Sequence, residues 1–417
     1  MIDTPPVALL TYSTKPRGGV VHTLALADAL FDLGVTVRVV SLGDPTQGFY
    51  RPVRAPVTIL PAPDCGPTLE EKVEANTQAM ADGLLEVAQA YPLLHSQDCI
   101  AARAVGRARL AGAHLVSLRT VHHVDDFTSP VLMDCQRQAI LEPDALLTVS
   151  QTWRQTLRID YGVEAQVVAN GVDLDRFAAV DPALRQRLRA RVAPERPLLL
   201  SVGGIEPRKG SLHLVRALAR LRRLLPVPPV LAVLGGHSFQ DHRAYREEVL
   251  AELPRLGLLA GRDVVELGLV PDAEVPGWYA AADALAFPST KEGFGLAVLE
   301  AMSAGLPVVT SDLPVFREYL QPGEDALLVP VGDEPALASA LARALTDQRL
   351  RRSLAAAGRE VARRFTWQAS ARQHAELYTD LLARGEPLGT GRGPGASTGD
   401  SVAIRVEPLA VPRFAEP

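Results

Sequence analysis

The alternation of short apolar strands with amphipathic helices constrains the fold of this chain more than any other feature. Residues 7–13, VALLTYS, form an apolar run with β-branching, and the loop TKPRGG separates them from VVHTLALADALFDLG, whose apolar residues recur at helical spacing. Gly34 has the position of a glycine that ends a helix, and VTVRVVSL then resumes as a strand. A strand, helix and strand in this order predict a parallel sheet, because parallel strands need a crossover connection.

The same alternation continues through two series. The first includes LLHS, HLVSLRTVH, ALLTVS and AQVVAN, and the second includes PLLLSVGG, PVLAVLGG, DVVELGLV, ALAFPS, LPVVTS and ALLVPV. Between them, NGVDLDRF at 170–177 is turn-rich, and the charged segment up to about Pro197 has the character of a connection. We therefore expect an α/β protein with two doubly wound, Rossmann-like domains, residues 1–177 and 178–365, facing each other across a cleft.

The C-terminal part of the chain changes character twice. Residues 366–384 have the pattern of a last amphipathic helix, which we expect to return to the N-terminal domain. Residues 385–417 contain six glycines and five prolines, so we expect a disordered tail there.

Composition excludes several classes of function. The 417 residues are 47% hydrophobic and 22% charged, which is typical of a soluble globular protein, and no apolar run reaches the length of a membrane span. The N-terminus lacks the features of a secretory signal, so we expect a cytoplasmic location. A net charge of −5 argues against a general nucleic-acid binder. The scattered residues Cys65, Cys99 and Cys135 suggest neither a zinc site nor a disulfide framework.

The stretch from Ser289 to Asp312, STKEGFGLAVLEAMSAGLPVVTSD, places two glutamates around a glycine turn that leads into a helix. Gly293 and Gly295 allow close backbone approach, and the free N–H groups and dipole of the helix amino end favour an anion such as phosphate. Glu292 lies in the turn and Glu300 about one helical turn inside, where carboxylates suit sugar hydroxyls. The alternative is structural, with Glu292 capping the helix and Glu300 solvated.

This motif, EGFGLAVLEAMSAGLPVV, resembles the signature of the GT-B glycosyltransferases, especially the retaining family 4, in which two glutamates are separated by seven residues. The resemblance extends from the GG loop near the start to about residue 384. It implies that Glu292 faces the donor sugar and that Glu300 holds the nucleotide ribose. It also implies that the diphosphate is bound by the backbone around the glycine turn, at Gly293, Phe294, Gly295 and Leu296.

The segment SVGGIEPRKGSLHLVRAL, residues 201–218, fits the other side of such a phosphate site. The chain has only four lysines, so a lysine in a glycine-rich loop is less expected to occur there by chance. The resemblance implies that Lys209 contacts the diphosphate. The family commonly has an arginine where this chain has Gly204, so either Arg208 substitutes or the site uses one cation fewer. A pair of solvated charges at a helix start is the structural alternative.

The N-terminal half supplies further candidates. Gly18 and Gly19 open the first helix, and the resemblance implies that their loop approaches the diphosphate and the acceptor. In RTVHHVDDF, the family's TxH element matches Thr120 to His122, which implies that His122 hydrogen-bonds the donor sugar. His123 is on the opposite side from His122 if the strand continues, so one of the two histidines should face away. The segment at 95–98, HSQD, is a further candidate for the acceptor side.

Three other features carry weaker interpretations. Val270, in GLVPDAEVPGWYAAAD, matches the segment whose backbone meets the nucleobase in the family. The DxD at Asp173 to Asp175 is interpreted as a turn rather than a metal site. Arg216, Arg220 and Arg223 form a basic helix stripe that is either a solvated face or a weak contact with an anionic membrane.

Together the residues and the resemblance predict a retaining glycosyltransferase that moves a sugar from a nucleotide diphosphate sugar to an acceptor hydroxyl. Lys209, Arg208 and helix amino ends would replace a metal ion, so we expect no metal and no cofactor besides the nucleotide-sugar co-substrate. A sugar phosphorylase-like enzyme and a non-catalytic nucleotide-sugar binding protein remain as alternatives. An oxidoreductase is disfavoured, because the first glycine loop lacks the GxGxxG fingerprint.

Overall fold

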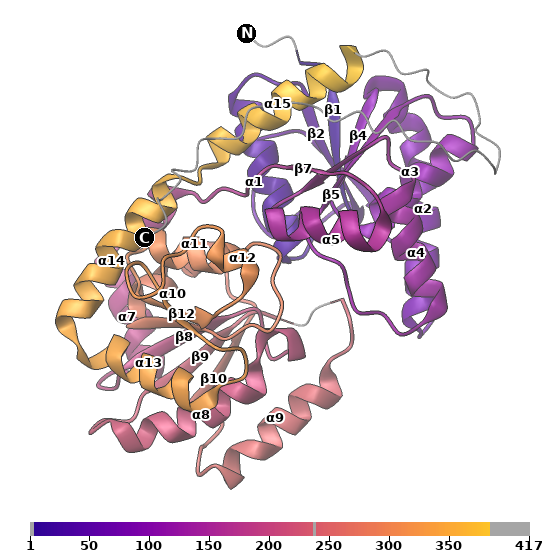
Figure 1. The fold of residues 1–417 in the computed structure, drawn as a ribbon. Helices are drawn as coiled ribbons and strands as arrows, with labels where there is room; N and C mark the ends of the chain where they lie inside the picture. The colour runs from indigo at the N-terminus through magenta and orange to yellow at the C-terminus, as the bar shows by residue number, and fades with distance from the viewer. Residues whose placement is uncertain (1–3, 237–238, 384–417) are drawn as a thin grey trace.

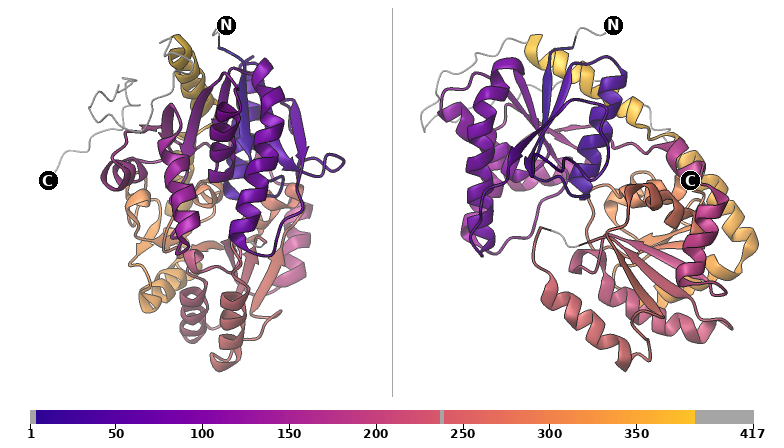
Figure 2. Two further views of the ribbon diagram at one scale, coloured as in Figure 1. Left: turned by 90° about the vertical axis from the view of Figure 1, so that its right-hand side faces the viewer. Right: turned by 180° about the vertical axis from the view of Figure 1, so that it is seen from behind.

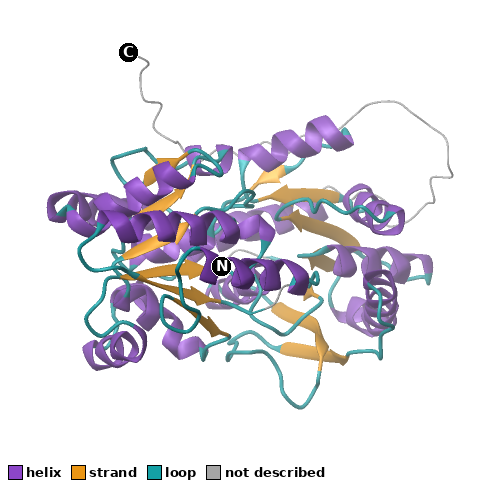
Figure 3. Cartoon of the chain, turned by 90° about the horizontal axis from the view of Figure 1, so that it is seen from below, coloured by secondary structure: helices purple, strands orange, loops and turns teal. Residues whose placement is uncertain are grey.

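The computed structural model describes residues 4–236 and 239–383, which form two lobes, each built on a parallel sheet (Figures 1 and 2). Seen from below, helices flank the strands of both sheets (Figure 3). The tail predicted for residues 385–417 lies outside the described residues. Within the described ranges, no helix is both long enough and apolar enough to cross a bilayer.

The first lobe contains, within the described residues, a sheet of seven parallel strands in the order β3-β2-β1-β4-β5-β6-β7. The strands are β1 (Val7–Thr11), β2 (Val37–Gly43), β3 (Val57–Pro61), β4 (Leu93–Ser96), β5 (Val116–Val121), β6 (Ala145–Thr148) and β7 (Gln166–Val167). The helices between them are α1 (Gly18–Asp32), α2 (Leu69–Ala90), α3 (Cys99–Leu110), α4 (Pro130–Leu141) and α5 (Gln151–Tyr161).

The second lobe has a sheet of six parallel strands among the described residues, in the order β10-β9-β8-β11-β12-β13. The strands are β8 (Leu198–Val202), β9 (Val230–Leu234), β10 (Val264–Gly268), β11 (Ala284–Phe287), β12 (Val308–Ser311) and β13 (Leu327–Val329). The helices, with two short 3₁₀ turns, are α6 (Leu174–Ala178), α7 (Pro182–Val192), η1 (Pro207–Lys209), α8 (Ser211–Leu224), α9 (Arg243–Arg255), η2 (Asp272–Glu274), α10 (Val275–Ala281), α11 (Leu296–Ser303), α12 (Pro314–Arg317), α13 (Glu334–Thr346) and α14 (Gln348–Arg363).

The strand order locates the site before any side chain is considered. In the first sheet the order reverses between β1 and β4, and in the second between β8 and β11. Crossovers on either side of such a switch point diverge to opposite faces, which leaves a crevice at the carboxyl ends of the two strands. The loops that follow β1, β4, β8 and β11 are therefore the ones that can shape a ligand site.

The last helix, α15 (Trp367–Ala383), packs against α1 in the first lobe and appears yellow in Figure 1. Its residues Trp367, Ala371 and Tyr378 belong to the same buried cluster as Leu24. The chain thus passes between the lobes a second time near residue 366. At this crossing the amide of Val172 donates to the carbonyl oxygen of Phe365 at 3.0 Å.

The structure differs from the sequence-based expectation at three elements. Strand β3 was not predicted, because it is an edge strand whose residues are only partly buried and carry little alternation. The short helix α6 begins within the turn-rich segment at 170–177 and ends one residue beyond it, and the segment predicted as a connection up to Pro197 contains α7. Helix α7 packs on α10 through the buried Leu188, and the partly buried Leu184 and Val192 pack against the same core, so a few apolar positions stabilise an otherwise charged helix.

Candidate functional site

A cavity of about 530 Å³ lies between the two lobes at the carboxyl ends of both sheets. Its size is within the range of pockets that hold small organic ligands. Its lining includes most of the residues predicted from the sequence: Gly18, Gly19, His122, Arg208, Lys209, Val270, Glu292, Gly293, Phe294, Gly295, Leu296 and Glu300.

Two cations and a carboxylate meet at the switch point of the second lobe. Lys209 Nζ lies 2.6 Å from Glu292 Oε1, and Arg208 Nη1 lies 3.3 Å from the same oxygen. Lys209 and Arg208 belong to η1 after β8, whereas Glu292 belongs to the loop after β11, and these two strands are neighbours. Gly203 makes room for the lysine, since a Cβ there would lie 2.4 Å from Lys209 Cε.

The charges in this cluster are coupled. Burial acts to raise the pKa of Glu292, but Lys209 and Arg208 outweigh it and hold the pKa below its ordinary value. Burial lowers the pKa of Lys209, and Glu292 opposes that shift. Glu206, which also lines the cavity, acts on Lys209 in the same direction as Glu292. Two cations thus lie among two carboxylates, and a diphosphate could take the place of Glu292 as their partner.

The amino end of α11 completes this side of the cavity. Gly295 adopts a left-handed conformation with φ of 94°, and no side chain caps the helix. By contrast, side chains cap α2, α3, α5 and α13. The Phe294 ring stacks on the Tyr319 ring, and the Tyr319 hydroxyl donates to the Phe294 carbonyl oxygen at 2.8 Å. These two contacts hold the turn in place. The first residues of α11, Leu296 and Ala297, line the cavity, so the amino end of this helix lies at the cavity wall.

Glu300 lies on the cavity wall rather than on a solvated helix face. The Tyr279 hydroxyl donates to Glu300 Oε2 at 2.5 Å. Burial raises the pKa of Glu300, despite the hydrogen bond from Tyr279 and the charge of Arg176. Val270 lies in the same wall, just after β10. A half-buried carboxylate held by a phenol can bind a pair of hydroxyl groups.

The first lobe contributes a second helix amino end and a neutral histidine. Helix α1 begins at Gly18 without a side-chain cap. His122 Nε2 lies 3.1 Å from Gln97 Oε1, and its ring is 4.6 Å from that of His22. Burial, with smaller contributions from His123 and Arg119, lowers the pKa of His122 to about 3. The imidazole is therefore uncharged at neutral pH and suited to hydrogen bonding.

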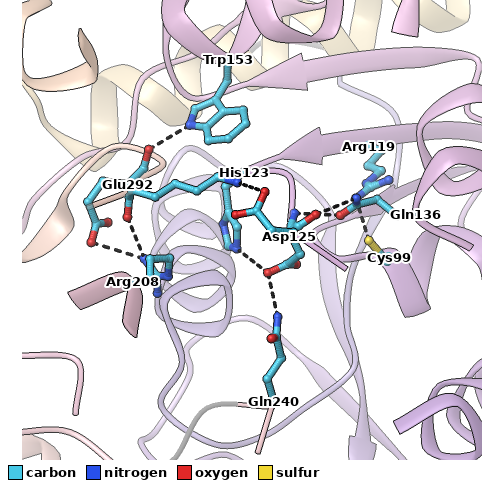
Figure 4. Close-up of polar contacts among 11 residues, drawn as sticks. Cys99, Arg119, His123, Asp125, Gln136, Trp153, Arg208, Gln240 and Glu292 are labelled. Atoms are coloured by element: carbon cyan, nitrogen blue, oxygen red, sulfur yellow. Dashed lines mark hydrogen bonds and ion pairs between the residues drawn. The ribbon is translucent and has the colours of Figure 1, made fainter. Parts of the chain in front are cut away.

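The strand does not continue to the two histidines, and neither His122 nor His123 faces away from the cavity. Strand β5 ends at Val121, so the alternation of a strand does not extend to the two histidines, and both line the cavity. His123 Nε2 lies 3.5 Å from Asp125 Oδ1, which also accepts a hydrogen bond from Gln240 Nε2 at 3.1 Å (Figure 4).

The predicted acceptor segment at 95–98 divides between the core and the cavity. His95 is buried behind the site, where its nitrogens lie 2.8 Å from the hydroxyls of Tyr378 and Thr120. Gln97 and Asp98 line the cavity. Asp98 caps α3 by accepting from the Ala101 amide at 2.8 Å, and burial raises its pKa to about 6.

Gly204 is the predicted site residue that the cavity lining does not include. Its φ is 77°, and a Cβ at this position would lie 2.7 Å from the carbonyl oxygen of Gly236. This backbone contact leaves no room for the arginine that the family commonly has. Of the two interpretations left open by the sequence, Arg208 does reach the cavity and contacts Glu292.

Several contacts close the lobes on each other around the site. Trp153 Nε1 of α5 donates to the Glu292 carbonyl oxygen at 2.9 Å, as Figure 4 shows. Lys291 Nζ lies 2.7 Å from Asp126 Oδ1. The Glu318 carboxylate accepts from the backbone amides of Gln151 and Thr152 at 2.8 and 2.7 Å, so one lobe caps a helix of the other.

Three arginines of the cavity lining, Arg17, Arg119 and Arg176, were given no role from the sequence, and two of them lie in the first lobe. Arg17 precedes α1, donates to the Tyr12 hydroxyl and lies with its guanidinium 5.6 Å from the Phe239 ring centroid. Arg119 lies on β5 and is only 3% exposed. Their positions beside the glycine loop and before the TxH element were the available signals, but only the tertiary structure shows that they face the cavity.

The other two motifs take structural roles. Asp173 accepts from the Arg176 amide at 3.0 Å and caps α6, in agreement with the interpretation of the DxD as a turn. Among residues 4–236 and 239–383, no group of three or more His, Cys, Asp or Glu side chains is arranged to hold a metal ion. In the basic stripe of α8, Arg216 and Arg220 form ion pairs with Glu334 at 3.7 and 3.8 Å.

Two Rossmann-like lobes with facing switch points define the GT-B class, and the comparison with solved structures agrees. Sucrose-phosphate synthase from Thermosynechococcus elongatus superposes with a TM-score of 0.75 at 25% identity, covering 91% of this chain and 100% of that one. Anabaena HepE, solved with UDP and glucose, has a TM-score of 0.75 at 22% identity over 90% and 99% of the two chains, a likeness of fold.

Sequence relatives identify the family within this class. Residues 16–176 match Glycosyltransferase Family 4, and residues 185–361 match Glycosyl transferases group 1. A D-inositol 3-phosphate glycosyltransferase from Stackebrandtia nassauensis is 30% identical over 91% of this chain and 92% of its own length. The chain therefore belongs to the group 1, family 4 glycosyltransferases, which confirms the resemblance found in the sequence.

Other relatives match over a smaller part. The GDP-mannose-dependent alpha-(1-6)-phosphatidylinositol monomannoside mannosyltransferase of Mycolicibacterium smegmatis is 31% identical over 65% of this chain and 72% of its own length. A D-inositol 3-phosphate glycosyltransferase from Jonesia denitrificans is 34% identical, and the match covers 60% of this chain and 58% of that protein.

Proposed function

We propose that this protein is a retaining, metal-independent hexosyltransferase that moves a sugar from a nucleotide diphosphate sugar to an acceptor hydroxyl. The observation that carries the proposal is the cluster of Lys209, Arg208 and the uncapped amino end of α11 at the second lobe's switch point, opposite the uncapped amino end of α1.

Departure of the nucleotide diphosphate requires stabilisation of negative charge. Lys209 and Arg208 can shift from Glu292 towards the phosphates, and the amides at Gly295 and Leu296 add hydrogen-bond donors whose positions are fixed in advance. These groups supply positive charge from the protein itself, which is the basis for proposing no metal requirement. Glu300 would hold the ribose through its second oxygen, since Tyr279 occupies the first.

Retention is supported by the groups near the sugar site. Glu292 is ion-paired with two cations, which weakens it as a nucleophile. With a pKa of about 3, His122 is a weak base at neutral pH. We therefore assign the acceptor proton to the leaving phosphate oxygen, on the same face of the sugar. His122 and Glu292 orient the donor sugar in this scheme.

The experiment is a transfer assay with GDP-mannose and UDP-glucose as first donors, because relatives are named or solved with these nucleotides. With inositol phosphates as trial acceptors, we expect nucleotide release, a product with the anomeric configuration of the donor by NMR, and full activity in EDTA. A product with inverted anomeric configuration would contradict the retaining mechanism, and loss of activity in EDTA would contradict metal independence.

The two alternatives give different outcomes in the same assay. A phosphorylase-like enzyme would consume inorganic phosphate and ignore nucleotide sugars. A non-catalytic binding protein would be stabilised by UDP or GDP without turnover; a ligand at about 100 times its Kd adds about 2.7 kcal/mol to the free energy of unfolding.

A further inference from the structure

Arg119 is a buried cation of the cavity wall for which the described residues provide no ion pair. It lies on β5 and is 3% exposed. Its Nη2 donates to Cys99 Sγ at 3.1 Å, while Nε and Nη1 have no hydrogen-bond partner (Figure 4). A buried charge in this state is costly unless a partner arrives.

The groups around Arg119 do not neutralise it directly. Burial raises the pKa of the Cys99 thiol, so its sulfur stays protonated and is only a weak acceptor. Asp98 is engaged by the backbone amides of Tyr12 and Ala101 at 2.9 and 2.8 Å. Asp125 is engaged by His123 and Gln240. The carboxylates of Asp98 and Asp125 interact electrostatically with Arg119 or its neighbour Cys99, but neither forms a salt bridge with the Arg119 guanidinium.

Arg119 also lies apart from the cations assigned to the donor. Lys209 and Arg208 belong to the second lobe, whereas Arg119 faces the cavity from the first lobe, beside the amino end of α3. The lining of the first lobe includes uncharged residues, Ile100, Phe127, Leu132, Cys135 and Gln136, together with the carboxylates Asp98 and Asp125. A polar ligand bound here would find in Arg119 a charged donor whose Nε and Nη1 have no hydrogen-bond partner.

We infer that Arg119 binds an anionic group, a phosphate or a carboxylate, on the acceptor. This inference rests on the proposed function, because it takes the first lobe as the acceptor side. The planar guanidinium suits both anions, and its unsatisfied N–H groups would gain charge-assisted hydrogen bonds when the acceptor binds. The acceptor class is then an anionic polyol or sugar rather than a neutral one.

The test compares glycerol 3-phosphate, glycerate and glycerol as probes, which share a carbon skeleton and differ in charge. Binding is measured by thermal shift with UDP or GDP present, so that the donor site is filled. We expect the two anions to stabilise the wild type and glycerol to have no effect. The variant Arg119→Met should weaken anion binding by about 10- to 100-fold.

The Tm without ligand is a second measurement, because it distinguishes an Arg119 that binds ligand from an Arg119 that stabilises the fold. Because Arg119 is buried and unpaired, Arg119→Met should keep or raise the Tm without ligand, and Arg119→Lys should retain part of the anion response. Arg137→Met, on the exposed face of α4, is the control for surface charge. A lower Tm together with an unchanged anion response in Arg119→Met would overturn the inference.

The source of the anion is distinguished with vesicles. Arg119-dependent retention on phosphatidylglycerol vesicles, absent with phosphatidylcholine, would assign the anion to a lipid head group. A response to the small anions alone would assign it to a soluble acceptor, and no Arg119-dependent response in either arm would refute the inference. Failure of the proposed function shows separately, as the absence of any stabilisation by UDP or GDP and of any transfer.

Discussion

Gly293 of the second lobe lies directly against the backbone of His122 in the first. A Cβ added to Gly293 would be 2.3 Å from the His122 carbonyl oxygen. The lobes thus meet backbone to backbone at the edge of the cavity, and the same loop accepts the hydrogen bond from Trp153. The closed arrangement depends on the absence of a side chain at this position.

Gly293→Ala is predicted to hold the lobes apart and lower kcat/KM by about 100-fold, because a displacement near 1 Å can cost that much in a positioned site. The matched control is Gly106→Ala, whose Cβ would meet only side-chain ends, the Glu142 carboxylate at 2.5 Å and Arg103 Nη1 at 3.6 Å, and no backbone. Steady-state kinetics and small-angle scattering check the prediction. Wild-type kinetics in Gly293→Ala would show that the contact is not required.

Lys209 and Glu300 are predicted to affect different kinetic constants. Lys209→Ala should lower kcat by about 100-fold or more, since its charge is needed most as the diphosphate leaves. Glu300→Ala should raise the donor KM by about 10- to 100-fold through lost ribose contacts. Arg220→Ala, on the surface of α8, serves as the control. The assignment fails if both variants have wild-type constants.

Restoring the family arginine should not improve this enzyme. Gly204→Arg places a side chain at a φ of 77° and against the Gly236 carbonyl oxygen, so it should lower the Tm by several degrees. Gly204→Ala shares both the backbone strain and the contact of its Cβ with the Gly236 carbonyl oxygen, so any further loss of Tm in Gly204→Arg is due to the long side chain. A stable and more active Gly204→Arg protein would contradict the proposed compensation by Arg208.

The buried histidines predict loss of stability in acid. Burial lowers the pKa of His374 from 6.5 to about 4, and burial aided by neighbouring charges lowers that of His122 to about 3. Between pH about 6.5 and about 4 the unfolded chain binds these protons and the folded chain does not. The free energy of unfolding therefore decreases as the pH is lowered through this range. The decrease is at most about 1.4 kcal/mol per pH unit for each histidine.

The measurement is the Tm as a function of pH for the wild type and His374→Asn, with the exposed His114→Gln as control. His374→Asn should reduce the slope, and His114→Gln should not. Asp98, whose pKa is raised to about 6, takes up its proton earlier in the folded state and acts in the opposite direction. Comparison of slopes between variants removes this shared contribution, so equal slopes would contradict the prediction.

Much of the fold could be predicted because short segments of the sequence carry the periodicity and turn residues of its strands and helices. The apolar runs at β1, β8 and β11 and the glycines after them identify parallel strands followed by helices, and the spacing of Glu292 and Glu300 identifies the donor motif. Strand β3 and helix α7 were not predicted, because their own sequences show little periodicity and their stability depends on packing against distant segments.

Local sequence patterns are sufficient to predict two parallel α/β lobes with glycine turns and charged residues at strand ends, because periodicity and turn chemistry depend on neighbours along the chain. The partners of those residues follow from the packing of the folded chain. The strand order β8-β11 brings Lys209 to Glu292, the end of β5 turns His123 into the cavity, and Gly236 excludes a side chain at Gly204. These contacts join segments far apart in sequence, where only packing of the whole chain sets the distances.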